Sequence, residues 1–453
     1  MINIFMQYDN EENKGMTGQE RHDYLTNKYG KNFCSSPWNS FHEGPQGLVS
    51  TCCKTRVPIG WSNKQSFEEM YNSDHAKDTR AKFLRGEKPA QCRGCWVQEV
   101  NGDVAFSRLM GNANTNLDEI ESLVAATDED GTLHEHKPYW LDFLWTNKCN
   151  FACLGCTPEL STTINNNFKK EFSILNRNES EYFPHMNEWQ NSGANKVQYV
   201  LDHADTIRNI HLNGGEPWLS EETYELLEEL LKRGLHKKIY IWSHTNGSIT
   251  KGYKGVDIVN DYLVHWGHHN MAKVIMSSDG YGQRGEYIRW GYKDKKWLET
   301  YHKVRDAKLV LNIQTCWNVY NALTIADIGE WYIDNCPPDS TPGMQQIVDG
   351  SLTIWDNQTT SPNMLHYMPE LVEQAKNQLI KAKNSGKHPK SWNLYLDRWI
   401  NWFNKEDPKH TEDMGNLKAW YDGNNALDAK RGTNFINTFP ELAPLYEKAQ
   451  TIS

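Results

Sequence analysis

The stretch CNFACLGC, residues 149–156, places three cysteines within eight positions of the chain. Cys149, Cys153 and Cys156 follow the spacing C-x3-C-x2-C, and no fourth cysteine lies close to them in sequence. A structural zinc ion takes four closed ligands, whereas three thiolates leave one metal position open. An iron–sulfur cube on three cysteines fits this pattern, because its fourth iron is free to bind a small molecule. The alternatives are a zinc ion with a distant fourth ligand and cysteines that bind no metal.

The sequence around this loop alternates short apolar runs with helical patterns from residue 138 onward. Such alternation is typical of repeated strand–helix units that build a parallel sheet. We expect strands at residues 139–145, 207–213, 238–245, 273–279, 309–316 and 345–354. Six strands predict an α/β fold, a partial (β/α)6 TIM-like barrel. The cysteine loop then follows the first strand, at the end where barrel enzymes carry their catalytic residues.

A helix is well marked after the second of these strands. Ser220 is suited to cap it, and Glu221 and Glu222 place negative charge in its first turn. Gly234 is suited to end it, because glycine readily adopts a left-handed conformation. The expected apolar stripe consists of Leu226, Leu227, Leu230 and Leu231.

The rest of the chain is expected to flank this barrel. Residues 1–31 form an N-terminal segment, 32–100 a small cysteine-rich unit held by metal, and 101–137 a linker with helical pieces. The barrel is expected over 138–369, and the aromatic-rich segment 370–453 reads as a helical C-terminal tail.

Composition excludes several classes of protein. The chain has 453 residues and a formal net charge of -10 without a basic block, which disfavours a long nucleic-acid partner. It contains no apolar run of the ~20 residues that span a membrane. Its start, MINIFMQYDNEENKG, lacks the pattern of a signal peptide. We therefore expect a cytoplasmic protein, in which clustered thiols indicate metal rather than disulfides.

A second group of cysteines precedes the barrel. Cys92 and Cys95 form a C-x2-C chelate, and Cys34 and Cys52 complete a set of four thiols. Cys53, next to Cys52, is an alternative ligand. A zinc ribbon is the alternative to an iron–sulfur cluster here.

Around the first cysteine loop, over residues 138–360, the chain resembles the radical S-adenosylmethionine (SAM) enzymes. CNFACLGC has the spacing of their cluster loop, and NGGEP, Asn213–Pro217, resembles their Gly-Gly-Glu motif. The resemblance implies that Cys149, Cys153 and Cys156 hold a 4Fe–4S cluster whose fourth iron binds SAM. It also implies that Asn213, Gly214, Gly215 and Glu216 bind the SAM amino group, where a carboxylate makes a charge-assisted hydrogen bond.

Further resemblances lie at the ends of later strands. Thr245 and Asn246 in HTNGS are expected at the mouth of the pocket. In SSDGYGQRGEYIR the resemblance implies that Ser278 contacts SAM and that Arg284 or Arg289 clamps its carboxylate, with a solvated surface role as the alternative for Arg284. Asn318 would contact the adenine or ribose, or have a structural role.

The earlier cysteine group resembles the SPASM/twitch auxiliary-cluster domains of the same superfamily. The resemblance rests on SPW, the CC pair and FLRGEKPAQCRGC. It implies one auxiliary 4Fe–4S cluster on Cys34, Cys52, Cys92 and Cys95, in the shorter twitch form. Such domains usually follow the barrel, whereas this one precedes it.

Other candidate residues have no clear partner in the sequence. Cys316, at the end of the fifth predicted strand, is a candidate catalytic thiol or a buried small residue. Asp279 is a candidate general base or a turn residue. His211 and His244 are expected near the pocket, and Cys336 has no assigned role.

The resemblance implies reductive cleavage of SAM to a 5′-deoxyadenosyl radical that abstracts a hydrogen atom from a substrate. Oxidative modification of a peptide or protein side chain is the expected outcome, and a sugar or nucleotide substrate is the alternative. An external one-electron reductant such as flavodoxin or ferredoxin is implied. A zinc-binding structural or regulatory protein is the alternative from another class.

Overall fold

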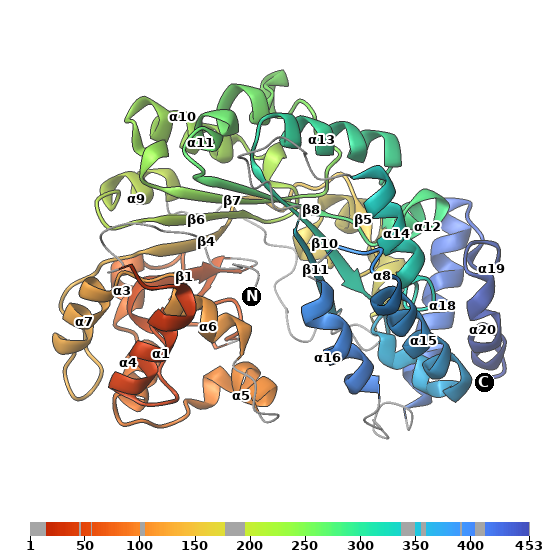
Figure 1. The fold of residues 1–453 in the computed structure, drawn as a ribbon, viewed down its shortest axis with the longest axis horizontal. Coiled ribbons are helices and arrows are strands. Elements are labelled where there is room, and N and C mark those ends of the chain that lie inside the picture. Colours follow the sequence, from red (N-terminus) through yellow and green to blue (C-terminus); the bar gives the residue numbers. More distant parts are fainter. Residues whose placement is uncertain are drawn as a thin grey trace. The chain divides into compact units, whose positions relative to one another are not determined.

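The computed structural model describes residues 15–44, 47–55, 57–99, 105–176, 195–336, 349–354, 359–389, 392–403 and 413–452 (Figure 1). Contacts within the chain define two compact units. The first unit comprises Met1–Trp145, Glu188–Asn213 and Glu228–Ile241, and the second comprises Thr146–Asn187, Gly214–Leu227 and Trp242–Ser453. Among the described residues, none of the helices combines the length and the apolar character that crossing a membrane requires.

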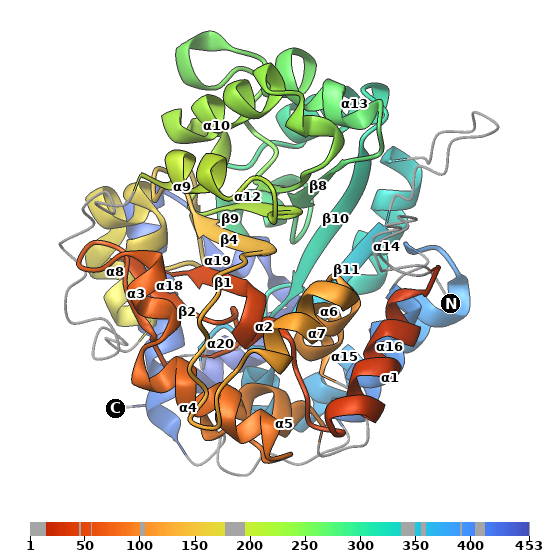
Figure 2. The same ribbon diagram turned by 90° about the vertical axis from the view of Figure 1, so that its left-hand side faces the viewer.

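The first unit contains a mostly parallel sheet with the strand order β6-β4-β1-β2-β3. Strand β4 (Trp140–Leu144) lies between β6 (Asn209–Asn213) and β1 (Ser40–Glu43) and is parallel to both. Strands β2 (Leu48–Ser50) and β3 (Gly60–Trp61) extend the sheet beyond β1 in antiparallel fashion. Figure 2 labels β1, β2 and β4. The cysteine-rich segment therefore contributes strands to the same sheet as β4, an arrangement that the sequence did not predict.

The two faces of this sheet differ in polarity. Phe41 and Phe143 point to one face, where both are buried and pack with Phe67 of α3 (Phe67–Tyr71) at ring distances of 5.4 and 5.2 Å. Alternate residues of a strand point to opposite faces. The opposite face therefore carries His42 and Asp142, which are only partly buried.

The first unit contains further helices in addition to α3. They are α1 (Gly18–Tyr29), α2 (Ser36–Asn39), α4 (Asp74–Leu84), α5 (Arg93–Glu99), α6 (Phe106–Ala113) and α7 (Leu117–Ala125), and α9 (Lys196–Asp202) follows later in the chain. Helix α1 begins with a capping box: Glu20 donates its backbone N–H to Thr17, and Thr17 donates its own to the Glu20 carboxylate.

The second unit contains the parallel strands β8 (Ala272–Ser277), β10 (Val310–Trp317) and β11 (Asp349–Ile354), with β10 in the middle. Strand β7 (Tyr240–Thr245) begins in the first unit and ends in the second. A short antiparallel pair, β5 (Ala152–Cys153) and β9 (Arg289–Trp290), fixes the cysteine loop. The helices of this unit are α8 (Lys169–Leu175), α11 (Val264–Gly267), α12 (Gly282–Ile288), α13 (Asp294–Asp306), α14 (Ile325–Asn335), α15 (Pro369–Ser385), α16 (Asn393–Phe403), α18 (Met414–Arg431), α19 (Phe435–Thr438) and α20 (Ala443–Gln450).

The predicted strands correspond to β4, β6, β7, β8, β10 and β11, so the strand predictions are confirmed within one or two residues where the chain is described. Residues 345–348 of the last predicted strand lie outside the described residues. The predicted helix is α10 (Glu221–Lys232), and Gly234 after it is left-handed, with φ of 70°. Leu226, Leu227 and Leu230 are fully buried, whereas Leu231 is only half-buried because it lies at the edge of the apolar stripe.

Arg80 of α4 joins separate segments of the cysteine-rich region. Its guanidinium is fully buried and donates hydrogen bonds to the carbonyls of Gly131, Pro37 and Tyr71 at 2.8, 3.0 and 2.8 Å. Pro37 belongs to α2, directly after Cys34. Arg80 thereby fixes the backbone that carries the first cysteine of the set.

We expect Arg80→Met to destabilise the protein by about 3 kcal/mol or more, since each orphaned buried acceptor costs about 1–3 kcal/mol. Arg85→Met is the matched control, because Arg85 is half exposed and pairs with the similarly exposed Glu87. Its effect should stay within about 0.5 kcal/mol. Urea unfolding followed by circular dichroism measures both. Equal midpoints for the two variants would contradict the structural role of Arg80.

Candidate functional site

The cysteine loop lies in the second unit and is fixed by backbone pairing. Cys153 lies opposite Arg289 in the β5–β9 pair. The backbone N–H of Phe151 donates to Cys149 Sγ at 3.4 Å, and the N–H of Cys156 donates to the Cys153 carbonyl at 3.0 Å. The loop thus presents three half-buried thiols from a folded backbone.

Burial and mutual repulsion disfavour thiolates in this loop. Burial raises the pKa of Cys149 well above its usual range, and the neighbouring Cys153 and Cys156 raise it further. Burial also raises the pKa of Cys156 to about 12. A bound metal reverses this preference, because a coordinated thiol loses its proton. The three thiols therefore suit a metal group and not a reactive free thiolate.

The NGGEP segment packs tightly against the start of the cysteine loop. The N–H of Gly215 donates to the Thr146 carbonyl at 2.7 Å, and the N–H of Glu216 donates to the Lys148 carbonyl at 2.8 Å. A Cβ at Gly214, where φ is 136°, would lie 2.4 Å from the Thr146 carbonyl oxygen. Glycine is therefore required for this close approach of two backbones.

The Glu216 carboxylate is fully buried and gathers donors from two segments. It accepts hydrogen bonds from the N–H of Asn246 at 2.7 Å, the N–H of Trp218 at 3.2 Å and the Thr245 hydroxyl at 3.0 Å. Burial outweighs these bonds and raises the pKa of Glu216 to about 7. The carboxylate thus holds the NGGEP segment against the end of β7.

Asn246 connects this carboxylate to the cysteine loop. Its backbone N–H reaches Glu216, and its side-chain amide donates to Asn150 Oδ1 at 2.9 Å and lies 3.9 Å from Cys149 Sγ. Its Oδ1 accepts from the N–H of Ser248 at 2.9 Å. The structure therefore brings together Cys149, Glu216, Thr245 and Asn246, which were predicted from separate motifs.

Arg289 and Asp279 form a buried ion pair at 2.7 Å. Asp279 also accepts the N–H of Cys316 at 2.7 Å, and Arg289 Nη1 lies 3.8 Å from Cys153 Sγ. Burial raises the pKa of Asp279, although Arg289 opposes the shift. Asp279 thus positions the Arg289 guanidinium beside the cluster loop, and both of its oxygens are engaged.

Other predicted contacts to SAM are engaged elsewhere in the protein. Arg284 forms a bidentate ion pair with Glu441. Ser278 is fully buried and donates to the Gly280 carbonyl at 3.2 Å, and Asn318 donates to the Cys316 carbonyl at 2.7 Å. Arg284 and Asp279 also line a cavity of about 100 Å³, which is smaller than the roughly 300 Å³ of a typical small-molecule site.

The four thiols of the first unit influence one another electrostatically. Burial raises the pKa of Cys52 well above its usual range, with contributions from Cys53, Cys34 and Cys92. Burial raises the pKa of Cys95 to about 12, with Cys34 contributing next. Cys34, Cys52, Cys92 and Cys95 thus form one group, to which Cys53 also belongs, and Cys53 in addition lies within electrostatic range of Asp142.

A buried ion pair supports this second group of thiols. Arg108 pairs with Glu99 at 2.8 Å and donates to the carbonyls of Lys31 and Phe33 at 2.9 and 3.2 Å. These carbonyls directly precede Cys34. The position of the first thiol therefore depends on a charged group that no cysteine motif reveals.

Sequence reasoning named His211 but missed the row of titratable side chains to which it belongs on the polar face of the first unit. His42, Asp142 and His211 lie opposite one another on β1, β4 and β6. Asp142 contacts His42 Nδ1 at 2.7 Å and His211 Nδ1 at 2.8 Å. The available signal was a charged residue in the middle of the apolar strand WLDFL.

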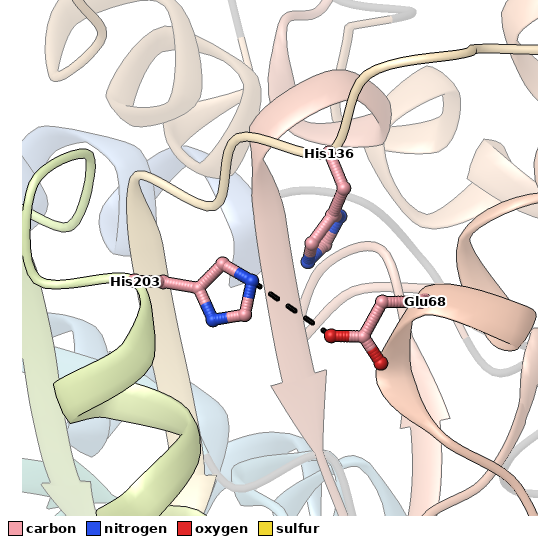
Figure 3. A group of neighbouring side chains, drawn as sticks. All are labelled: Glu68, His136 and His203. Carbon is pink, nitrogen blue, oxygen red and sulfur yellow. Dashed lines mark ion pairs between the residues drawn. The ribbon is translucent and has the colours of Figure 1, made fainter.

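Glu68, His136 and His203 form another polar cluster in this unit (Figure 3). Their ligand atoms lie within 4.8 Å of one another, the only such group of three among the described His, Cys, Asp and Glu residues. His203 pairs with Glu68 at 3.7 Å and contacts the Tyr199 carbonyl through Nδ1, while His136 Nε2 contacts the Tyr199 hydroxyl. The ion pair and these contacts to Tyr199 account for the cluster.

Two segments match iron–sulfur families. Residues 34–96 match SPASM, an iron–sulfur cluster-binding domain, and residues 141–264 match a 4Fe-4S single cluster domain. Each match contains one of the two cysteine sets. They confirm the prediction of 4Fe–4S clusters as cofactors. No curated protein matches the chain.

Solved structures with a partial likeness include three complexes. Native anSMEcpe with bound AdoMet has 16% identity and a TM-score of 0.33, with 53% of this chain and 60% of that chain covered. Streptococcus suis SuiB bound to S-adenosylmethionine has 13% identity and a TM-score of 0.34, with 58% of this chain and 50% of that chain covered. SuiB bound to precursor peptide SuiA has 13% identity and a TM-score of 0.34, with 83% of this chain and 65% of that chain covered. The chain thus spans about 60% of the first relative. TM-scores of this size are too low to establish a shared fold.

We expect Gly214→Ala to destabilise the protein by more than about 2 kcal/mol. Alanine is strained at the positive φ of this position, and its Cβ would also clash with the Thr146 carbonyl oxygen. Gly234→Ala is the matched control. Gly234 is also left-handed, but no heavy atom lies within 4 Å of a Cβ placed there. Its cost should be about 1 kcal/mol.

Urea midpoints of the two glycine variants, measured side by side, test this prediction. A Gly214→Ala variant as stable as Gly234→Ala would mean that the close approach to Thr146 does not constrain the segment.

Proposed function

We propose that this protein is a radical SAM enzyme that cleaves S-adenosylmethionine and abstracts a hydrogen atom from its substrate. The observation that carries the proposal is the contact between three elements. The C-x3-C-x2-C loop, the NGGEP segment and the end of β7 are joined by hydrogen bonds to Glu216, Asn246 and the Thr146 carbonyl. Zinc binding alone has no use for a buried carboxylate with this arrangement.

The residues present fit both cofactors. Cys149, Cys153 and Cys156 offer three thiols for a 4Fe–4S cluster and leave one iron for SAM. When bound, the reduced cluster supplies the electron that cleaves SAM.

The remaining roles belong to the protein. Gly214 and Gly215 allow the NGGEP segment to pack against the backbone before the cysteine loop, and Glu216 accepts a hydrogen bond from the SAM amino group. Thr245 and Asn246 hold that carboxylate in place. Arg289, which Asp279 orients, places a positive charge beside the anionic cluster. We assign no SAM contact to Arg284, Ser278 or Asn318, whose side chains have the partners described above.

Cys34, Cys52, Cys92 and Cys95 are proposed to hold an auxiliary 4Fe–4S cluster. An auxiliary cluster can accept an electron from a substrate radical, so the net reaction is proposed to be an oxidation. A peptide or protein side chain is the proposed substrate. SuiB, one of the partly similar structures, was solved with a precursor peptide, which supports this choice by analogy only.

Iron analysis of oxygen-free reconstituted protein, with dithionite and SAM added to an aliquot, tests the proposal. We expect about eight iron atoms per chain and formation of 5′-deoxyadenosine, because each cube contains four irons. Cys153→Ala should retain about four irons and lose SAM cleavage, and Cys92→Ala should retain about four irons. Cys336→Ser is the control, since Cys336 is a buried thiol outside both sets.

The possible results separate the alternatives. Four irons together with 5′-deoxyadenosine in the unaltered protein would refute only the auxiliary cluster. Zinc without iron, or full SAM cleavage by Cys153→Ala, would refute the proposed enzyme.

SAM affinity should also depend on the ionisation of Glu216. Its pKa of about 7 means that the carboxylate becomes protonated as the pH falls below 7. The SAM ammonium requires the carboxylate, so affinity should fall by up to about tenfold per pH unit between pH 6.5 and 5.5. Glu216→Gln should bind SAM about 10- to 100-fold more weakly, with no such pH dependence.

Calorimetry on the reconstituted protein measures both affinities across this range. Parallel pH profiles for the unaltered protein and Glu216→Gln would rule out Glu216 as the titrating group.

A further inference from the structure

The polar face of the sheet in the first unit carries His42, Asp142 and His211, and packing of the sheet does not require these side chains. On the apolar face, Phe41, Phe143 and Leu212 are fully buried. The facing row of His42, Asp142 and His211 remains partly accessible, with side-chain exposures of 21, 14 and 12%. A sheet covered on both faces normally carries apolar residues on both. Three charged or titratable side chains in register therefore indicate a surface that meets a polar ligand.

Both imidazoles of the row turn Nδ1 towards the Asp142 carboxylate. Both oxygens of Asp142 are engaged, one by each imidazole Nδ1. Asp142 thus faces an imidazole Nδ1 on each side, and the nitrogen that His42 offers to a ligand is Nε2. His42 Nε2 forms no hydrogen bond with any described residue, so it is the donor available on this face.

The charges around the row favour a protonated His42. Burial opposes its protonation, but the Asp142 carboxylate outweighs burial and raises the pKa of His42. Glu43 on the same strand adds a smaller contribution in the same direction, although its own carboxylate pairs with Lys196 at 2.6 Å. Two imidazoles hold the pKa of Asp142 well below its usual range.

We propose that His42, oriented by Asp142 in the row with His211, is a binding site for an anionic oxygen group of the substrate, a carboxylate or a phosphate. The Nε2–H of the imidazolium donates a charge-assisted hydrogen bond to the anion, which is stronger than a bond to a neutral carbonyl. Asp142 is a positioning residue: it holds the proton on Nδ1 and thereby directs Nε2 towards the ligand. That the anion belongs to a substrate rests on the proposed function. The anion site itself is formed by residues of the first unit alone.

The test uses reconstituted protein without SAM, labelled with 13C at histidine Cε1. Sodium acetate and sodium phosphate are titrated separately against a chloride control of equal ionic strength. His42→Gln and His211→Gln assign two of the seventeen histidine signals. We expect the His42 signal to shift saturably with at least one anion, and the affinity to be at least about tenfold weaker at pH 9 than at pH 6 as the imidazolium loses its proton.

His134 provides the internal control. It also pairs with an aspartate, Asp128, at 2.8 Å, but both side chains are largely exposed and lie outside the row. Its signal should change only slightly and without saturation. Asp142→Asn should weaken binding at His42 by about tenfold or more, because the imidazole loses its charged partner.

The outcomes separate the sources of the anion. Saturation by acetate at lower concentration than phosphate supports an acidic side chain or chain terminus, and the reverse supports a phosphate ester such as a nucleotide. Equal, linear shifts of His42 and His134 would show an adventitious ion only and would overturn the proposal. If His42→Gln does not fold, His42→Asn identifies the His42 signal, and His134→Gln identifies the control signal in the same way. The unaltered protein then decides between saturation and linearity. Loss of SAM cleavage would refute the proposed function and leave this binding result standing.

Discussion

The buried Glu216 carboxylate determines how the cysteine loop, the NGGEP segment and the end of β7 pack together. A carboxylate without solvent contact is unfavourable unless donors surround it. The donors are the N–H groups of Asn246 and Trp218 and the Thr245 hydroxyl, so the NGGEP segment and the end of β7 must meet at that carboxylate. Asn246 then reaches Asn150 in the cysteine loop. The cysteine loop is thereby positioned by hydrogen bonds within the protein, which is the preorganisation that a cluster site needs.

Local patterns in the sequence were sufficient for the strands and for the motifs, but not for long-range pairing. Apolar runs bounded by polar turns predicted β4, β6, β7, β8 and β10, because strands buried on at least one face keep this pattern. Strand β1 was missed, since four residues with polar Ser40 and His42 do not resemble a buried strand. Its partner β4 lies 100 residues later. No local signal encodes that pairing, and the cysteine-rich region was consequently expected as a separate unit.

The candidate site shows the same division between local and long-range information. Cys149, Glu216 and Asn246 were recognised from short motifs, and their contacts agree with those motifs. Arg284 was suggested by the resemblance of SSDGYGQRGEYIR, and Asn318 by its place after the fifth predicted strand. In the structure their side chains contact Glu441 and the Cys316 carbonyl. Arg108, which fixes the backbone before Cys34, belongs to no motif. A motif identifies the residues that touch a cofactor, whereas the residues that hold those in place depend on tertiary packing.

Stability alone does not account for the row of His42, Asp142 and His211. Replacing a buried or half-buried ionic group by apolar residues of similar size is often neutral or stabilising. The opposite face of the same strands follows that rule with Phe41, Leu141, Phe143 and Leu212. A single substitution in the row would leave a charge without its partner, so the three side chains depend on one another. Such a group is not needed to hold β1, β4 and β6 together, because backbone pairing already does so. Local departures from stability rules concentrate at functional sites, and the polar face of this sheet is such a departure.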